Sequence, residues 1–393
     1  MSAASKIPPL RFKGFEGAWK SYEFGGVYER INAKKYQIES SRYLNLGCFP
    51  VVDQGKDLIV AYTNDANKVF SAAESPVIVF GDHTREVKFV EFDFAIGADG
   101  TQLMRCCANF EISFAYYVMK RLTLPNMGYS RHYKFLLEAQ YLFPNLREQQ
   151  KIASAFRSLD ALIADRKSAV EKLQTLKKAM LEKMFPRAGA KVPEVRFKGC
   201  EGEWKEKRLG DSVRFAKGKG YSKSDIQEEG TPLFLYGRMY TDYQIEVDRV
   251  DTFCVQRNGS VLSVGNEVVC PASGETAEDI ACASAVKEKG IVLGGDLNIL
   301  VPHANSGLDP TFLAMSLTYG SGRAKIVERA QGKTVVHIHN SDLEDVVVLS
   351  PSLLEQRKIG AYFRSLDALI SARQEEVGKL KDLKKALLDR MFV

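Results

Sequence analysis

Apolar residues recur at alternating steps of four and three residues in two long segments of the chain, 146–185 and 353–392. This spacing is the heptad pattern of a coiled-coil helix, which places one apolar seam along each segment. At about 1.5 Å per residue, a helix of this length extends on the order of 60 Å. Arg166, Lys177, Arg373 and Lys384 interrupt the two seams at the same steps. The apolar seam positions are Ile152, Phe156, Leu159, Ile163, Val170 and Leu173 in the first segment and Ile359, Phe363, Leu366, Ile370, Val377 and Leu380 in the second.

The two helical segments are copies of one another. Aligned without a gap, 146–185 and 353–392 are identical at 24 of 40 positions. A shorter repeat precedes each copy, because residues 11–19 read RFKGFEGAW and residues 196–204 read RFKGCEGEW. The duplication favours antiparallel pairing of the two helices about a pseudo-two-fold axis, with the shared Arg and Lys helping to set the register. The alternative is two independent coiled coils that recruit other chains, although each would leave a long apolar stripe exposed.

Prolines mark the helix boundaries. Pro144 and Pro351 come just before the two helices, Pro186 follows the first, and residues 187–195 are typical of a linker. Further apolar residues widen each stripe beyond a strict seam, which predicts packing on more than one neighbour. These extra positions are Leu162, Ala169, Leu176, Leu369 and Leu383.

The regions between the repeats, about 22–143 and 206–350, hardly resemble each other. Runs such as 75–80 and 345–349 predict strands, whereas 110–120 and 310–319 predict short helices. The predicted fold class is therefore α+β, with two globular mixed α/β domains joined by two long antiparallel helices in a pseudo-two-fold repeat. The predicted boundaries are 1–145 for the N-terminal repeat segment and first domain, 146–186 for the first helix, 187–204 for the linker and second repeat segment, 205–352 for the second domain, and 353–393 for the second helix.

Composition describes an ordinary soluble protein, with 45% apolar and 26% charged residues. A net charge of +6 suits a polyanionic partner such as nucleic acid, although many soluble enzymes are as basic. No apolar run approaches the roughly 20 residues of a membrane span, and the N-terminus lacks the apolar core of a signal peptide. We therefore expect a cytoplasmic protein without membrane association. The seven cysteines show no CxxC pair, which argues against a disulfide framework and a zinc site.

Catalytic motifs are missing. An adenine-N6 methyltransferase is expected to show an Asn- or Asp-Pro-Pro-aromatic loop, and the chain has no NPP or DPP tripeptide. It also lacks a G-x-S-x-G elbow and a GxxxxGK[ST] phosphate loop. Two tripeptides, 86–88 and 203–205, match the E-x-K half of a nuclease metal site, but such tripeptides arise by chance in a chain this rich in charge. His337 and His339 would share one face of a strand without an acidic or thiol third ligand, so no metal site is predicted.

The order of the repeats resembles that of the specificity (S) subunit of Type I restriction-modification systems. The resemblance rests on the EQ-x-KI openings at 148–152 and 355–359, the RSLDALI cores at 157–163 and 364–370, and the KK and MF endings of both helices. It covers essentially the whole chain. It implies that each variable region is a target recognition domain, which reads one half of an asymmetric bipartite sequence in double-stranded DNA. The antiparallel helices would act as a ruler between the two halves.

The resemblance also implies that the chain is a non-catalytic subunit. In this family adenine is methylated by separate modification (M) subunits, here expected to be two, which bind S-adenosylmethionine. Cleavage belongs to restriction (R) subunits, which use ATP and Mg. The repeated helices would supply the docking surface for these partners. No cofactor is expected in this chain itself.

In the first domain the candidate DNA contacts lie in polar turns that follow apolar strands. Arg and His side chains can reach guanine edges or phosphates, and Asp can accept a hydrogen bond from cytosine N4. A tight turn stabilised by Asp82 and a structural role for Tyr129 are the open alternatives. The candidates are Gln54, Tyr62, Asp82, His83, Thr84, Arg85, Tyr129, Ser130, Arg131 and His132.

In the second domain a glycine-containing loop at 217–225 carries three lysines and a tyrosine. Small residues let a backbone approach phosphate, and lysines supply a salt-sensitive attraction to it. An arginine between two tyrosines and a Ser-Gly turn follow further along the chain. The candidates are Lys217, Lys219, Tyr221, Lys223, Tyr236, Arg238, Tyr240, Ser273, Lys333 and Thr334.

Two other functions remain open at this point. One is a self-sufficient DNA endonuclease that uses an E-x-K site, which would cut plasmid DNA in the presence of Mg²⁺ without any other subunit. The other is a coiled-coil adaptor whose globular domains bind proteins, which would show no salt-dependent retention of DNA.

Overall fold

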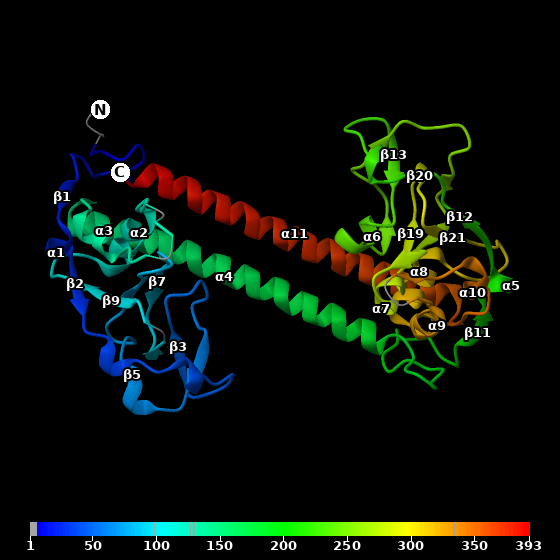
Figure 1. Cartoon of the computed structure of the whole chain (residues 1–393), viewed down its shortest axis with the longest axis horizontal. Helices are drawn as coiled ribbons and strands as arrows, with labels where there is room; N and C mark the ends of the chain where they lie inside the picture. The colour runs from blue at the N-terminus through cyan, green and yellow to red at the C-terminus, as the bar shows by residue number, and fades with distance from the viewer. Residues whose placement is uncertain (1–5, 98, 126, 129, 333–334) are drawn as a thin grey trace. The chain divides into compact units, whose positions relative to one another are not determined.

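A computed structural model of the chain describes residues 6–97, 99–125, 127–128, 130–332 and 335–393. Three predicted contact residues, Tyr129, Lys333 and Thr334, lie outside these ranges. The chain divides into two compact units, Met1–Ser168 with Gln374–Val393, and Ala169–Arg373. Both division points fall inside the two long helices, α4 (Leu146–Lys183) and α11 (Leu353–Met391), so each unit contains part of both (Figure 1). Within the described ranges, no helix is long and apolar enough to cross a membrane.

The first unit contains two four-stranded sheets. The antiparallel sheet has the order β2-β9-β6-β7, and its central strand β6 is buried along its whole length. The second sheet has the order β4-β3-β8-β5 and pairs β3 with β8 in parallel. A short ribbon of β1 and β10 leads into α4. The bounds are β1 (Lys20–Tyr22), α1 (Phe24–Val27), β2 (Tyr28–Ile31), β3 (Phe49–Val52), β4 (Ala61–Thr63), β5 (Val69–Phe70), β6 (Val77–Gly81), β7 (Val87–Val90), β8 (Phe94–Ile96), β9 (Thr101–Cys106), α2 (Ile112–Arg121), α3 (Tyr133–Glu138) and β10 (Tyr141–Phe143).

The second unit contains a five-stranded sheet of order β12-β21-β17-β19-β14 and a four-stranded sheet of order β15-β13-β20-β16. Two further ribbons pair β11 with β23 and β18 with β22. The bounds are β11 (Lys205–Arg208), α5 (Leu209–Ser212), β12 (Val213–Lys217), β13 (Thr231–Phe234), α6 (Arg238–Thr241), β14 (Glu246–Val247), β15 (Phe253–Cys254), β16 (Leu262–Val264), β17 (Glu267–Pro271), β18 (Ser273–Gly274), α7 (Ala277–Ile280), β19 (Ser284–Val286), β20 (Lys289–Leu293), β21 (Leu297–Pro302), α8 (Pro310–Tyr319), α9 (Ser321–Arg329), β22 (Val336–His337), α10 (Asn340–Glu344) and β23 (Val347–Ser350).

The two units share a topology although their variable sequences hardly resemble each other. In both, a ribbon leads into the long helix, and the larger sheet has four strands paired antiparallel, β2-β9-β6-β7 or β12-β21-β17-β19. The smaller sheet of each unit contains one parallel pair, β3 with β8 or β13 with β20, and in the second unit β14 also adds to the larger sheet in parallel. The helix that follows the last central strand starts with an acidic N-cap in both units, Glu111 for α2 and Asp309 for α8. The α+β class with two mixed domains is confirmed.

α4 and α11 pack antiparallel, as predicted, and lysines of the seam link them. In the second unit Lys177 of α4 forms an ion pair with Asp367 of α11. In the first unit Lys384 of α11 forms the equivalent ion pair with Asp160 of α4. Both lysines occupy the same position of the repeat, 207 residues apart, so the pairing has a pseudo-two-fold register. All twelve apolar seam residues are buried or half-buried.

The leucines that widen the two stripes have a different environment. Leu162 and Leu383, which belong to the first unit, are 38% and 50% exposed. Leu176 and Leu369, which belong to the second unit, are 41% and 42% exposed. Residues of the repeat that are equivalent by sequence therefore leave an apolar surface on each unit.

An aromatic cluster repeats in the cores of the two units. In the first, the Trp19 and Phe392 rings both pack on Phe114, with centroids 5.5 and 5.1 Å from it. In the second, Trp204 and Phe185 pack on Phe312 at 5.5 and 5.7 Å. These residues come from the short repeat, from the MF ending of a long helix and from α2 or α8. The repeated sequences thus build the same core around each variable domain.

A glutamine of each EQ-x-KI opening binds the variable domain through backbone atoms. The Gln149 side chain accepts from the N–H of Glu111 at 2.9 Å and donates to the carbonyl of Pro144 at 2.9 Å. Gln356 likewise accepts from the N–H of Asp309 at 2.8 Å and donates to the carbonyl of Pro351 at 2.9 Å. Because these partners are main-chain groups, the domain sequence can change while the attachment stays the same.

Candidate nucleic-acid interface

Two of the predicted contacts in the first domain, Asp82 and His132, are buried and stabilise the turn at 81–85. Asp82, just after β6, is 2% exposed, and its carboxylate accepts from the backbone N–H of Tyr133 at 2.7 Å. His132 is fully buried, and its backbone N–H donates to the carbonyl oxygen of Asp82 at 2.8 Å. The His132 ring Nδ1 lies 2.9 Å from the same oxygen. This burial favours the structural interpretation of Asp82 and extends it to His132.

Gln54 is brought to the same turn from the loop after β3. Its side chain accepts from the backbone N–H of His83 at 3.2 Å and donates to the carbonyl of Asp99 at 2.8 Å. The hydroxyl of Thr84 donates to the carbonyl of Gln54. A Cβ at Gly81 would lie 2.7 Å from that carbonyl oxygen, so only glycine permits this approach. The structure therefore brings Gln54 to His83 and Thr84, although Gln54 lies 29 residues before His83 in the sequence.

Arginines border this turn. Arg85 has a φ of 64°, in the left-handed region, and its guanidinium donates to the carbonyl of Leu124 at 3.3 Å. Arg131 is exposed, and Ser130 beside it is half-buried. Tyr62 lies on β4 in the other sheet, where its backbone bonds with Leu44. Of these residues, Arg131 presents the most accessible cation.

Lys88, the lysine of the first E-x-K tripeptide, has a structural role. Its side chain is 6% exposed, and Nζ donates to the carbonyl of Asp53 at 2.8 Å and to that of Asp57. The Asp53 carboxylate is 3.7 Å away. Burial lowers the pKa of Lys88, although Asp53 acts in the opposite direction. Lys88 therefore fixes the loop that carries Gln54 and is not placed as a metal-site lysine.

A basic hollow in the first domain was not predicted from the sequence. A cavity of about 670 Å³ is lined by Lys34, Lys35 and Arg105 together with the rings of Tyr36 and Phe70. The Lys35 Nζ lies 4.5 Å from the Tyr36 ring centroid. The sequence pattern that could have identified this cavity is the pair of adjacent lysines at 34–35 followed by an aromatic residue.

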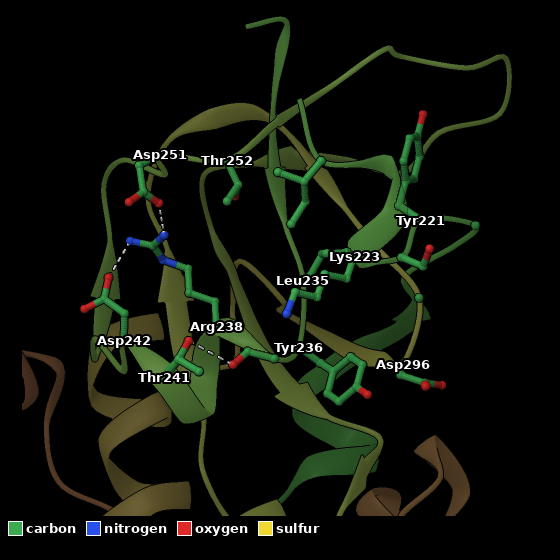
Figure 2. A pocket seen from close by; sticks show the side chains of 15 residues that line it. Tyr221, Lys223, Leu235, Tyr236, Arg238, Thr241, Asp242, Asp251, Thr252 and Asp296 are labelled. Carbon is green, nitrogen blue, oxygen red and sulfur yellow. Dashed lines mark hydrogen bonds and ion pairs between the residues drawn. The ribbon is translucent and has the colours of Figure 1, made fainter. Parts of the chain in front are cut away.

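The second domain has a cavity of about 960 Å³ that brings together four predicted contacts (Figure 2). Arg238 lies between two carboxylates there, bonded to Asp242 at 2.6 Å and to Asp251. The two acidic partners offset its charge and limit its attraction to phosphate. The four predicted residues that line the cavity are Tyr221, Lys223, Tyr236 and Arg238.

A neighbouring cavity of about 750 Å³ contains Tyr236, Tyr240 and Ser273. The Tyr240 hydroxyl donates to the carbonyl of Ser273 at 2.8 Å, and burial raises the pKa of Tyr240. Ser273 is buried on β18, where its backbone pairs with His337. Tyr240 is 40% exposed, so its ring remains accessible while its hydroxyl has a fixed acceptor.

The glycine-containing loop has accessible lysines but uses its first glycine for packing. Lys217 and Lys219 are exposed. A Cβ at Gly218 would lie 1.8 Å from the carbonyl oxygen of Gly294, so this glycine permits contact within the domain. Within the part of the chain that the structure describes, no group of three His, Cys, Asp or Glu residues could hold a metal ion.

No protein-family model matches the chain. Over 399 residues it is 23% identical to the Type I restriction enzyme EcoR124I/EcoR124II specificity subunit of Escherichia coli, covering 98% of this chain and 95% of that protein. The putative type I restriction enzyme MjaX specificity subunit of Methanocaldococcus jannaschii is 25% identical over 269 residues, covering 63% and 57%. The solved Type I restriction-modification S subunit from M. genitalium has the same fold, with a TM-score of 0.64 at 17% identity over 98% and 99% of the chains. The chain belongs to the specificity subunits of Type I restriction-modification systems.

A specificity subunit is itself non-catalytic, which sets aside the endonuclease alternative. Members of the family carry no cofactor, and S-adenosylmethionine and ATP belong to the M and R subunits. In the first E-x-K tripeptide, the Lys88 side chain donates its hydrogen bonds to backbone carbonyls. Glu203 and Lys205 of the second tripeptide are both exposed.

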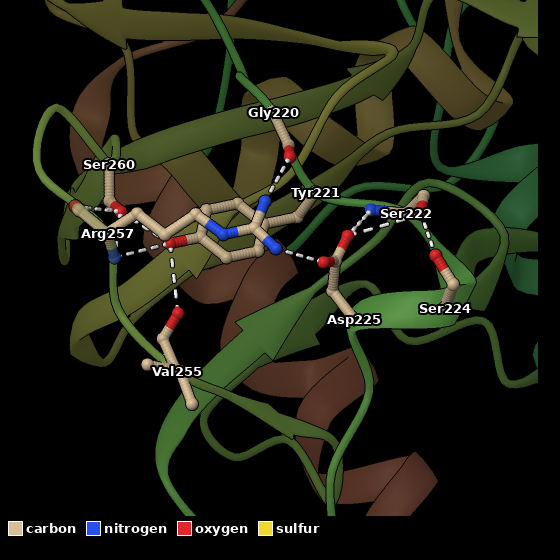
Figure 3. Close-up of polar contacts among 8 residues, drawn as sticks. All are labelled: Gly220, Tyr221, Ser222, Ser224, Asp225, Val255, Arg257 and Ser260. Carbon is tan, nitrogen blue, oxygen red and sulfur yellow. Dashed lines mark hydrogen bonds and ion pairs between the residues drawn. The ribbon is translucent and has the colours of Figure 1, made fainter.

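One accessible cation of this specificity subunit was missed by sequence reasoning. Arg257, on the loop after β15, lies over the ring of Tyr221, with its guanidinium carbon 4.8 Å from the ring centroid (Figure 3). The sequence pattern that could have identified Arg257 is the polar turn at 255–260, which follows a strand. The turn at 81–85 was identified from the same kind of pattern. The arginine there has no neighbouring cation or aromatic residue in the sequence.

Proposed function

We propose that this specificity subunit recognises an asymmetric two-part sequence in double-stranded DNA, with one part read by each unit. The observation that carries the proposal is the shared topology of two units whose loops differ. The same framework of sheets and helices presents, in each unit, a cluster of polar loops next to the end of a central strand, β6 or β17. Because the loops differ in sequence, the two half-sites should differ as well.

The loops offer hydrogen-bond donors of the types used on base edges and phosphates. In the first unit Thr84 and Arg131 are exposed, and in the second Lys217, Lys219 and Lys223 are exposed. Lysines at such positions contribute a salt-sensitive, sequence-independent attraction to phosphate, whereas arginine can bind guanine with two parallel hydrogen bonds. Asp82, His132 and Ser273 support these loops from inside and are left out of the proposed contact surface.

The long helices supply the spacing between the two reading units in this proposal. α4 and α11 each run without interruption through a division point between the units. Ion pairs between them on both sides of that point, from Lys177 and from Lys384, fix their register. Half-sites about one turn of DNA apart are separated by roughly 34 Å, which is within the length of such a helix.

The partners in this proposal are two M subunits and the R subunits of the same system, in the cytoplasm. Of the leucines that widen the two stripes, each unit exposes one from each long helix, Leu162 and Leu383 in the first and Leu176 and Leu369 in the second. Equivalent apolar surfaces on equivalent units suit two copies of one partner, because each surface offers the same contacts. S-adenosylmethionine would enter with the M subunits, and ATP and Mg with the R subunits.

Mapping of methylated adenines tests the proposal. The full chain is combined with the M subunits of its own system, and methylated positions are sequenced in DNA of known sequence. We expect one asymmetric two-part consensus, and methylation at sites without a shared two-part consensus would overturn the proposal. Arg131→Ala should weaken discrimination in only one half of that consensus. If the purified chain retained no DNA at low salt, the protein-adaptor alternative would be favoured.

A further inference from the structure

Tyr221, one of the predicted DNA contacts, is largely buried in the second unit. The residue is 6% exposed, and the Arg257 guanidinium covers its ring. Its hydroxyl accepts from the backbone N–H of Arg257 at 2.8 Å and lies 2.6 Å from the Ser260 hydroxyl. Tyr221 therefore holds the loop at 255–260 with its hydroxyl and the arginine side chain with its ring, as Figure 3 shows.

Arg257 is fixed by further bonds and still accessible. Its Nη1 donates to the carbonyl of Gly220 at 3.1 Å, and its Nη2 donates to the carboxylate of Asp225. Even so, 56% of the arginine side chain is exposed. A free surface arginine gives up about 2 kcal/mol of rotamer entropy when it is immobilised. Here the protein has already ordered the side chain, so a ligand would meet a preformed group.

The donors that remain on Arg257 match a base edge. A guanidinium has five N–H donors, and the contacts with Gly220 and Asp225 each occupy one of them. Each terminal nitrogen then retains one N–H, so two donors remain, the number that a bidentate contact with guanine O6 and N7 needs. The Asp225 carboxylate offsets the positive charge and would repel a phosphate at close range. A neutral acceptor pair is therefore the better ligand.

We propose that Arg257 reads a guanine in the major groove of the half-site bound by the second unit, with Tyr221 and Asp225 as its positioning residues. This inference rests on the proposed function. Tyr221 takes no part in the DNA contact itself, because its ring faces the guanidinium.

The test uses the full chain assembled with the M subunits of its own system and maps methylated adenines for Arg257→Ala and Arg257→Lys. Both variants should lose discrimination at one G·C position of one half-site by roughly 5- to 150-fold, the range for a good bidentate pair. Lysine keeps the charge but lacks the planar fork, so it should not restore discrimination. Lys325→Ala, which removes an exposed positive charge from α9, serves as the control and should leave the consensus unchanged.

Tyr221→Phe tests the positioning role. It keeps the ring under Arg257 and removes the hydroxyl that holds the loop, so it should relax the same G·C position to a smaller extent. The other half-site provides an internal check that each variant is folded and assembled. Uniform weakening at all sequences would indicate a phosphate contact and overturn the inference, as would an unchanged consensus. A wild-type complex without a two-part consensus would instead overturn the proposed function, and the assignment of Arg257 with it.

Discussion

The guanidinium of Arg11 donates to both carboxylate oxygens of Glu148, at 2.7 and 2.6 Å, and Arg196 repeats this with Glu355 at 2.9 and 2.6 Å. Each of these two arginines also donates to a glycine carbonyl of its own short repeat. Arg11 donates to Gly17 and Arg196 to Gly202, both at 2.6 Å. The Glu148 side chain is fully buried. The short repeat is therefore a clamp on the first turn of each long helix.

Removing one partner of this buried pair should destabilise its unit. Glu148→Ala leaves the Arg11 charge without its partner in a largely buried position, at a cost of roughly 3 kcal/mol in the free energy of unfolding. The chain has only two tryptophans, so urea unfolding followed by Trp19 fluorescence in a Trp204→Phe background reports on the first unit. Glu182→Ala, at an exposed position of the same helix, should change the midpoint little. If Glu148→Ala changed the midpoint as little as Glu182→Ala, the clamp would contribute no stability.

The attachment of each variable domain through Gln149 or Gln356 gives a second prediction. Gln149→Leu leaves the N–H of Glu111 and the carbonyl of Pro144 without their partner, at a cost of about 2 kcal/mol. Amide hydrogen exchange of Glu111 should then become roughly 30-fold faster, because local opening becomes easier by that amount. Gln150→Leu, at the exposed neighbouring position, is the matched control and should leave this rate unchanged.

Sequence patterns predicted the long helices, whereas the way distant segments pack against one another was not predicted, for a physical reason. The heptad spacing is a local signal, and the duplication adds the antiparallel register that places Lys177 opposite Asp367. The shared topology of the two variable domains was not predicted, because strand pairing joins distant segments and their sequences differ. Tyr221 shows the same difficulty in the site. The arginine that covers it comes 36 residues later, and no local pattern connects the two.

Acid should weaken the first unit through Asp93. Its carboxylate accepts from the backbone N–H groups of Ala73 at 3.1 Å and Ala72 at 2.9 Å and from the Ser71 hydroxyl at 3.1 Å. The backbone bond with Ala73 is the main cause that lowers the pKa of Asp93 below its ordinary value of 3.8. Because the folded pKa is the lower one, this stabilisation is complete above pH 3.8 and is lost as the pH falls through the folded pKa.

Asp93→Asn has no carboxylate to titrate, so its difference from the wild type in unfolding free energy should be largest near neutral pH and shrink in acid. Urea titrations followed by Trp19 fluorescence at several pH values measure this difference. Glu74→Gln, at an exposed position of the same unit, should show no such trend. A pH-independent difference for Asp93→Asn would contradict the assignment.

The exposed leucines predict how many M subunits bind. Leu162→Lys with Leu383→Lys introduces two charges into the apolar surface of the first unit, and Leu176→Lys with Leu369→Lys does so in the second. Each pair should remove one M subunit from the complex, and all four substitutions should remove both, as counted by native mass spectrometry. Leu46→Lys, at a position that is 84% exposed in a loop, should leave the count unchanged. Loss of both M subunits from either pair alone would mean that the two surfaces do not act separately.

The last prediction concerns the distance that the two long helices set between the half-sites. The register of α4 and α11 determines where residues can be inserted to test it. An insertion into α4 alone would shift Lys177 or Asp160 away from its partner, so a lost activity would say nothing about distance. Seven residues inserted after Ser168 and seven after Arg373 keep both ion pairs and preserve the heptad phase within each unit. The added length is about 10 Å, which corresponds to roughly three base pairs of DNA. The methylated consensus should keep both half-sites and lengthen the spacer by about that number. A complex that methylates the original spacer with undiminished preference would show that the helices do not set the distance.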